Sequence, residues 1–248
     1  MKPRFSIIIP AYNEALLLPR LLDSIEIAAA RYGSDHVEII VADNLSTDGT
    51  RAVAEMKGSR VVTVTKRRIA AARNGGAAAA NGDILCFIDA DSALHPETFH
   101  KIDEAMLNEH IVAGATGVFL ERRSVGLIAT YFMMLPVLWL TGMDTGVVFC
   151  RREDFDAVGG YNEKLYIAED VAFLYALKRR GIAKRQHLTR LSGVKALGST
   201  RKFDEHGDWH YFSILAKSMG ILIRKGMSIF TRQDDIPDLT DYWYRPQR

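Results

Sequence analysis

The chain has 248 residues, of which 48% are hydrophobic and 25% are charged. This composition is typical of a folded globular protein and excludes a largely disordered chain. The net charge of +2 is too small to indicate nucleic acid as the main partner. The length fits one α/β domain and does not require two.

The first half of the chain alternates short apolar runs with helical patterns. The apolar runs, which we expect to be strands, are Phe5–Ile9, Val37–Ala42, Val61–Val64 and Ile84–Ile88. The spacing of apolar residues and the turn signals between them predict helices over Leu16–Arg31, Thr50–Lys57 and Ile69–Asn81. Continuous apolar strands are typical of a parallel sheet that is covered on both faces. We therefore predict an α/β fold with a doubly wound, mostly parallel central sheet flanked by helices.

The second half is less regular. Its expected strands are Val112–Leu120 and Thr145–Cys150, and its expected helices are Pro96–Asn108, Asp170–Arg180 and Trp209–Lys225. Gly181 is expected to end the helix that begins at Asp170. No repeat or low-complexity linker divides the chain, so we expect one domain over residues 1–230 and a C-terminal tail over 231–248.

The two cysteines, Cys86 and Cys150, both lie in apolar runs. We interpret them as small buried residues in a reducing compartment, with a disulfide or thiol site as the alternative. The apolar run near the N-terminus stops at Pro10, which makes it too short for the core of a signal peptide. These features predict a cytoplasmic active site.

Acidic residues follow three of the predicted strands. Glu14 lies just past the first strand, Asp43 ends the second, and Asp89 and Asp91 follow the fourth. Ligands of open α/β sheets bind beyond the carboxyl ends of the strands. Unrelated surface turns would not need a common edge of the sheet, whereas a nucleotide site would.

The Asp89-Ala90-Asp91 segment places two carboxylates one residue apart. Like charges this close are unfavourable unless a cation neutralises them, and carboxylate oxygens suit Mg²⁺ or Mn²⁺. Such an ion can bridge a diphosphate and stabilise the charge on a leaving nucleotide. The alternative is a solvated acidic turn, because Asp-x-Asp is frequent by chance.

Other candidates also have a structural alternative. Asp43 could accept a hydrogen bond from the imide N–H of a base, or it could form an Asx turn. Tyr12 could stack on a base or pack on the core. Glu14 could meet a ribose, or it could favour the N-terminus of the next helix.

The chain resembles the family 2 glycosyltransferases, which have the GT-A fold of nucleotide-diphospho-sugar transferases. The resemblance covers about residues 5–181 and is carried by Ser6–Glu14, Val41–Thr50, Ala72–Gly76, Asp89–Asp91 and Glu169–Asp170. No single segment is decisive, but the ordered set is specific. The resemblance implies a nucleotide-sugar-binding half over residues 1–110 and an acceptor-binding half over 111–230.

The resemblance also implies roles for single residues. The nucleotide-sugar site would be lined by Pro10, Tyr12, Glu14, Asp43, Arg73, Asp89 and Ala90. Asp91 would bind the metal, and a late histidine, His206 or His210, could complete that site or be an ordinary structural histidine. Asp170 would be the catalytic base. The acceptor would lie against Gly159, Gly160, Tyr161 and Glu169.

The predicted reaction moves a sugar from a nucleoside-diphosphate sugar to an acceptor hydroxyl or lipid phosphate, with inversion. UDP-sugar is favoured because Asp43 suits uracil, and the acceptor could be a glycan, a lipid-linked compound or a small molecule. Asp170 would take the acceptor proton, while Mg²⁺ or Mn²⁺ and cationic groups hold the leaving diphosphate. Many relatives carry a Gln-x-x-Arg-Trp motif that this chain lacks, which favours a single transfer over polymer synthesis.

Several alternatives stay open. The chain could be a retaining transferase on the same fold, a sugar-1-phosphate nucleotidyltransferase, or a catalytically silent protein that docks on membranes. The nucleotidyltransferase class usually has a glycine-rich first loop, and Pro10–Glu14 occupies that position here. Asp170 could also serve only the N-terminus of its own helix, and Arg73 could be a surface residue.

The segment Ser124–Met143 has no charged residue over 20 positions. It is long enough to span a bilayer, but a span would put Asp91 and Asp170 on opposite sides, and Pro136 interrupts a helix. We expect the segment to pack on the core, line the acceptor cleft or touch a membrane surface. The nine Lys or Arg residues between Val171 and Phe203, with no Asp or Glu, suit either a solvated surface or anionic lipid. The enzyme would then be cytoplasmic, either free or at the inner face of the membrane.

Overall fold

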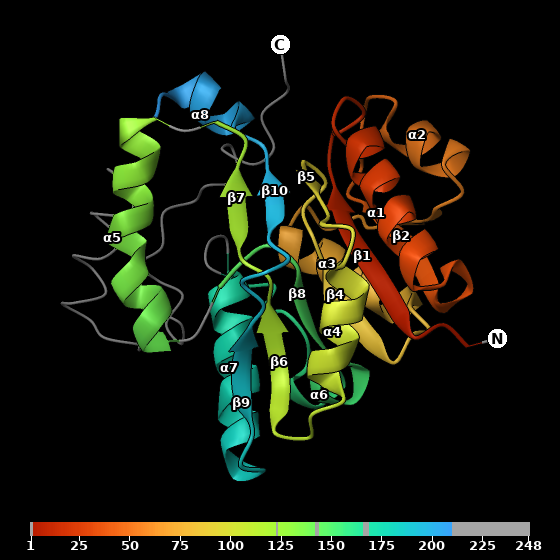
Figure 1. Cartoon of the computed structure of the whole chain (residues 1–248). Helices are drawn as coiled ribbons and strands as arrows, with labels where there is room; N and C mark the ends of the chain where they lie inside the picture. The colour runs from red at the N-terminus through yellow and green to blue at the C-terminus, as the bar shows by residue number, and fades with distance from the viewer. Residues whose placement is uncertain (1, 123, 142–143, 166–168, 210–248) are drawn as a thin grey trace.

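The computed structural model describes residues 2–122, 124–141, 144–165 and 169–209, which form an α/β fold (Figure 1). Within these ranges the central sheet has seven strands in the order β3–β2–β1–β4–β8–β6–β9. In chain order the strands are β1 (Phe5–Ala11), β2 (Val37–Asp43), β3 (Arg60–Thr63), β4 (Ile84–Phe87), β6 (Ile111–Ala115), β8 (Val148–Arg151) and β9 (His187–Arg190). Neighbouring strands run parallel, except that β8 is antiparallel to β4 and to β6. The predicted fold class is confirmed.

Helices cover both faces of this sheet. One face is covered by α1 (Leu18–Tyr32) and α4 (Thr98–Met106). The other face is covered by α3 (Ile69–Ala79), α6 (Arg152–Val158) and α7 (Glu169–Ala183). Strand β1 is buried on both sides, because Ile7 and Ile9 pack in the first core and Ile8 in the second. This is why its sequence is a continuous apolar run.

A small second sheet stands beyond the end of β4. In the described part of the chain it consists of three short strands, β5 (Ser92–Ala93), β10 (Ala196–Gly198) and β7 (Val118–Leu120), in that order. Leu197 in the middle strand lies opposite both Ala93 and Phe119. Because β5 begins directly after Asp91, this sheet extends from the edge where the predicted acidic residues lie.

The remaining helical segments complete the fold. They are the 3₁₀ turn η1 (Ser34–His36), α2 (Thr50–Met56), α5 (Val125–Thr141) and α8 (Arg201–His206). One of them, α2, packs beside α1 through the buried Ala54. Helix α5 stands beside the small sheet, and α8 lies near the end of that sheet (Figure 1). Among the described residues, no helix combines the length and apolar character needed to cross a bilayer.

Two predicted elements differ from the structure. The strand expected over Val112–Leu120 is two strands, β6 and β7, because the chain turns at Gly117, which has a φ of +76°. The helix expected to end at Gly181 runs through it to Ala183. A Cβ at Gly181 would lie 2.9 Å from a methyl carbon of Val112, so this glycine allows close packing of α7 on β6 and is not a helix stop.

Cys86 and Cys150 are buried on the adjacent strands β4 and β8, and both are free thiols. Burial raises the pKa of both thiols above the usual range. They therefore behave as the small buried residues that the sequence predicts. The predicted helix beyond Trp209 and the tail over 231–248 lie outside the described residues, so the domain boundary stays a prediction.

Close packing of α3 on the sheet gives a test of the fold. A Cβ at Gly76 would lie 2.5 Å from Cγ2 of Ile8 and 3.4 Å from Cβ of Ala42. We expect Gly76→Ala to lower the free energy of unfolding by about 1–2 kcal/mol, because the clash outweighs the gain in helix propensity. Urea denaturation measures the change. Gly193→Ala is the control, since nothing lies within 4 Å of a Cβ there. Equal losses in the two variants would contradict this account.

Candidate active site at the carboxyl edge of the sheet

The predicted site residues follow neighbouring parallel strands. The register pairs Ala11 at the end of β1 with Asp43 at the end of β2. It also pairs Ile8 of β1 with Phe87 of β4, so that Pro10 is level with Asp89. The loops after β1, β2 and β4 therefore leave the sheet at one edge, as the sequence pattern predicts for a ligand site.

Arg73, on α3, holds three carboxylates at this edge. Its Nη1 donates to Oε1 of Glu169 at 2.7 Å and lies 2.9 Å from Oδ1 of Asp170. Its Nη2 donates to Oδ1 of Asp89 at 2.9 Å. The side chain is only 4% exposed, and the guanidinium lies 5.1 Å from the centroid of the Tyr161 ring. A buried cation thus joins α3, the end of β4 and the start of α7.

The charges in this cluster shift the pKa values of its members. Burial alone would lower the pKa of Arg73, but the carboxylates, Asp170 foremost, raise it well above its usual value. Burial raises the pKa of Asp170; Arg73 opposes the rise, while Glu169 and Asp89 add to it, and the result is about 7. The Asp170 side chain is 22% exposed, so a substrate can reach it. A carboxyl group with these properties can exchange a proton near neutral pH.

The Asp89–Asp91 turn is held by a residue that the sequence analysis does not single out. Arg20 on α1 donates to the main-chain carbonyl of Asp91 at 2.8 Å. The same guanidinium pairs with Glu121, which follows β7. Ala90 is buried between the two aspartates, whereas the Asp89 side chain is 54% exposed. Arg20 therefore anchors the main chain of this turn, while the Asp89 side chain stays accessible to solvent.

A divalent cation fits this turn only as a partly protein-bound ion. Among the described residues, no three His, Cys, Asp or Glu side chains form a group that could hold a metal. Mg²⁺ sites often use one or two carboxylates and complete the shell with substrate phosphates and waters. The exposed Asp89 carboxylate and the neighbouring Asp91 match that donor set. The side chain of His206 in α8 and all of His210 lie outside the described residues.

The loops after β1 and β2 are bonded to each other. Asp43 is buried, and its Oδ1 accepts a hydrogen bond from Ser46 N at 3.1 Å, which is the expected Asx turn. Asn13 has a φ of +54°, and its Oδ1 accepts from Thr47 N at 2.8 Å. These bonds give the two loops a fixed shape without using all the acceptor capacity of the Asp43 carboxylate.

Tyr12 and Glu14 both contact arginines. The guanidinium of Arg67 lies 5.3 Å from the centroid of the Tyr12 ring. Oε1 of Glu14 accepts a hydrogen bond from Nη2 of Arg201 at 2.6 Å, and both side chains are largely buried. Arg201 belongs to α8, so the end of the described chain closes over the first loop. No local sequence signal indicates this pairing.

The predicted acceptor residues Gly159, Gly160 and Tyr161 follow α6, and the Tyr161 ring contacts the guanidinium of Arg73. The two glycines have φ values of +79° and +72°, and they turn the chain after α6. Asn74 accepts from Tyr161 N at 2.8 Å and donates to Tyr161 O at 2.9 Å. The Tyr161 ring is buried and stacks on Phe173, with ring centroids 4.1 Å apart. It supports Arg73 from the core side, and its contact with an acceptor stays a prediction.

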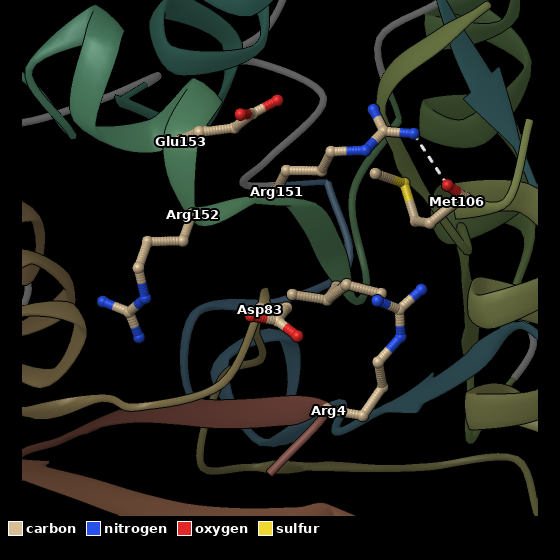
Figure 2. A pocket seen from close by; sticks show the side chains of 7 residues that line it. Arg4, Asp83, Met106, Arg151, Arg152 and Glu153 are labelled. Atoms are coloured by element: carbon tan, nitrogen blue, oxygen red, sulfur yellow. Dashed lines mark hydrogen bonds between the residues drawn. The ribbon is translucent and has the colours of Figure 1, made fainter. Parts of the chain in front are cut away.

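A cavity of about 380 Å³ lies at the opposite end of the sheet, where β1 and β4 begin (Figure 2). It is lined by Arg4, Asp83, Ile84, Met106, Arg151, Arg152 and Glu153. Arg151 donates to the carbonyls of Met106 and Ile111, and Arg152 donates to that of Gly82. These guanidinium groups satisfy main-chain carbonyls at the ends of elements, which is a structural role.

Comparison with known proteins identifies the family of this chain. The model of glycosyl transferase family 2 matches residues 6–155, which is more than half of the chain. The chain belongs to glycosyl transferase family 2. The expected enzyme class is therefore confirmed, and the matched range includes the loops after β1, β2 and β4. Membership favours glycosyl transfer over the nucleotidyltransferase alternative.

Individual relatives agree with this family. Validoxylamine A glucosyltransferase from Streptomyces hygroscopicus subsp. jinggangensis is 28% identical over 226 residues, which cover 73% of this chain and 52% of that protein. The chain thus spans about half the length of this relative. The activity of the full-length relative therefore does not establish the activity of this chain.

Two solved structures share the fold. The mannosyltransferase PcManGT from Pyrobaculum calidifontis, in complex with GDP-Man and Mn²⁺, matches with a TM-score of 0.70 at 22% identity over 91% of this chain and 66% of that one. Glucosyl-3-phosphoglycerate synthase from Mycobacterium tuberculosis, in complex with Mn²⁺, UDP and glucosyl-3-phosphoglycerate, matches with a TM-score of 0.61 at 22% identity over 88% of this chain and 80% of that one. At this identity the likeness shows the fold alone, and it agrees with the predicted GT-A fold.

The Arg73 cluster gives a second test. Arg73→Met leaves three carboxylates close together without their cation, and we expect the free energy of unfolding at about pH 8 to fall by about 3–5 kcal/mol. The carboxylates would then bind protons more strongly in the folded state, so the loss should shrink as the pH falls toward about 5. Urea denaturation at both pH values measures this. Arg31→Met, which breaks the exposed pair with Glu97, is the control and should change stability little at either pH. A pH-independent loss at Arg73 would contradict the electrostatic explanation.

Proposed function

We infer that this family 2 glycosyltransferase transfers a sugar from a nucleoside-diphosphate sugar to an acceptor with inversion, with the help of Mg²⁺ or Mn²⁺. The observation that carries the inference is Asp170, a reachable carboxyl group of raised pKa held by Arg73 next to Asp89. The bound GDP-Man, UDP and Mn²⁺ of the two structural neighbours support the same class of donor and ion.

Asp170 would act as the general base. The acceptor hydroxyl loses its proton to Asp170 while its oxygen attacks the anomeric carbon, and the bond from that carbon to the diphosphate oxygen breaks. Attack opposite the leaving group inverts the anomeric configuration. Arg73 contacts Asp170 from the buried side, and this contact orients the carboxylate toward the open side of the edge. We assign Arg73 a positioning role for Asp170 in place of the expected role in lining the nucleotide-sugar site.

Asp91 and Asp89 would hold the cation. A bound Mg²⁺ or Mn²⁺ supplies positive charge that stabilises the leaving nucleoside diphosphate. Arg20 fixes the main chain of Asp91, so the carboxylate is presented without a large loss of freedom when the ion binds. His206 stays a candidate for an additional ligand.

The nucleoside would lie over the loops after β1 and β2. Pro10 and Asp43 are buried at the two strand ends, and Tyr12 stands beside them as a stacking surface. One oxygen of Asp43 holds its own turn, and the other would accept the N3–H of uracil. UDP-sugar is therefore the favoured donor, and GDP-sugar is the competitor that PcManGT suggests.

The acceptor is expected on the side of Asp170, Glu169 and the Gly159–Gly160 turn. A glycan, a lipid-linked compound or a small molecule could supply the hydroxyl, and a lipid phosphate could replace it. A retaining transferase would differ from the proposed enzyme in the anomeric configuration of its product. We propose a cytoplasmic setting for the reaction.

Nucleotide and metal binding can be tested without knowing the acceptor. We expect UDP with Mn²⁺ to raise the melting temperature, and either one alone to raise it much less, because the ion would be held by Asp91 and would neutralise the charge of the diphosphate. Asp91→Ala should remove the part of the shift that depends on Mn²⁺. Asp35→Ala, which changes an exposed acid in η1, is the control and should keep the full shift. If UDP shifted the melting temperature equally with and without Mn²⁺, the proposed metal dependence would be wrong.

The base can be tested by its pH dependence. We expect kcat/KM to rise with pH through an apparent pKa near 7, because Asp170 must be ionised to accept a proton. Glu169→Gln removes a charge that raises the pKa of Asp170, so this limb should move to lower pH. Asp170→Asn should lower turnover by about 10²–10⁴-fold while UDP–Mn²⁺ binding is kept.

Steady-state kinetics with a hydrolysable donor, and NMR of the product anomer, measure these outcomes. Donor hydrolysis by water provides a readout when no acceptor is known. Full activity of Asp170→Asn would remove the base assignment, and a product of retained configuration would favour the retaining alternative.

A further inference from the structure

An apolar face lies on α5 and the adjoining strand β7. Its exposed side chains are Val125, Ile128, Tyr131 and Phe132 on α5 and Phe119 on β7. Phe132 is 63% exposed and Phe119 is 55% exposed. Helix positions three, four and seven residues apart lie on one side, so the four α5 residues form a single stripe. Contiguous apolar patches of this kind usually mark an interaction surface.

Lys195 joins the two parts of this face. Its Nζ lies 4.2 Å from the centroid of the Phe119 ring and 6.0 Å from that of the Tyr131 ring. No carboxylate of the described ranges pairs with it, in contrast to Arg122 just after β7, which pairs with Asp204 and Asp208. The ammonium group thus lies against two aromatic rings of the face and has no carboxylate partner among the described residues.

The face is continuous with the catalytic edge. Phe119 lies opposite Leu197 in the small sheet, and Leu197 lies opposite Ala93. Ala93 is two residues beyond Asp91 in the sequence. Figure 1 shows α5 standing beside this sheet. A surface that covers the face would therefore lie along the same small sheet that begins at the donor turn.

We propose that this face, formed by Phe119, Val125, Ile128, Tyr131, Phe132 and Lys195, docks on a lipid surface that contains anionic lipids. A helix with an apolar face can lie in the plane of such a surface with that face among the lipid chains. Aromatic side chains favour the boundary between headgroups and chains. The ammonium group of Lys195 lies against the Phe119 ring of this face, where it can meet a headgroup phosphate.

The charge pattern favours lipid over a protein partner. From Val125 to Thr141 the helix has no charged residue, whereas the rim of a protein interface is usually polar and charged. Lys195, which has no carboxylate partner in the described part of the chain, gives the border of the apolar stripe a cation that complements a layer of phosphates. The proposal concerns where the enzyme resides and does not depend on which sugar is transferred.

The test uses the full chain and sedimentation with lipid vesicles. The vesicles are of phosphatidylcholine alone, or of phosphatidylcholine mixed with phosphatidylglycerol. We expect stronger binding to the mixed vesicles, and weaker binding at high salt. Phe132→Asp should lower the partition coefficient by about tenfold or more on both vesicle types. Lys195→Gln should lower it by about fivefold on the mixed vesicles only.

Matched controls lie elsewhere on the surface. Leu107→Asp changes a side chain that is equally exposed but follows α4, and Lys164→Gln changes an exposed lysine outside the face. Both controls should bind vesicles like the unchanged protein. Losses equal to those of Phe132→Asp and Lys195→Gln would overturn the proposal, as would the absence of binding to mixed vesicles.

A second measurement distinguishes lipid from a second copy of this chain as the partner of the face. If Phe132→Asp converts an oligomer to a monomer by light scattering while vesicle binding is absent, a second copy covers the face and the proposal is wrong. Donor hydrolysis in the absence of vesicles should be unchanged in both face variants. The docking test can therefore fail while the proposed transfer stands, and the reverse also holds.

Discussion

The buried guanidinium of Arg73 is the interaction on which the site depends. Removing a cation from water is costly unless charged partners surround it, and Asp89, Glu169 and Asp170 provide those partners. They come from the end of β4 and the start of α7, which are far apart in the chain. The cluster therefore fixes the second half of the molecule against the first. The same contacts hold the proposed base beside the proposed metal turn, so the fold and the site share one electrostatic constraint.

Sharing one cation among three carboxylates has a chemical consequence. One positive charge cannot fully compensate three negative ones, so at least one carboxyl group has a raised pKa. Asp170 is that group, because it is partly buried and has Glu169 and Asp89 near it. A single tight pair with Arg73 would have lowered the pKa and made a weaker base. The crowding that destabilises the ionised cluster thus suits Asp170 to accept a proton near neutral pH.

The parts of the fold that could be predicted are those with a local signal. The runs of β1, β2 and β4 are mostly apolar because these strands are covered on both faces, and the acidic residues after them indicate the proposed ligand edge. The short strands β9 and β10 and the helix α8 have too few residues for a period to show. Gly181 looks like a helix stop because a packing glycine and a capping glycine are the same residue. The partners Arg20 and Arg201 are set by tertiary contact, which no neighbouring sequence encodes.

Those two arginines also explain how distant segments act as one body. Arg20 joins α1 to the Asp91 carbonyl and to Glu121 after β7, and Arg201 joins α8 to Glu14 in the first loop. Strand β10 lies between β5 and β7. The small sheet is therefore tied to the donor loops by both ion pairs, while its outer strand β7 contributes Phe119 to the proposed lipid-docking face. Under the proposed function and the proposed docking, these ion pairs would keep the donor edge in a constant position relative to the lipid surface, and an acceptor anchored in that surface would be presented to the same edge.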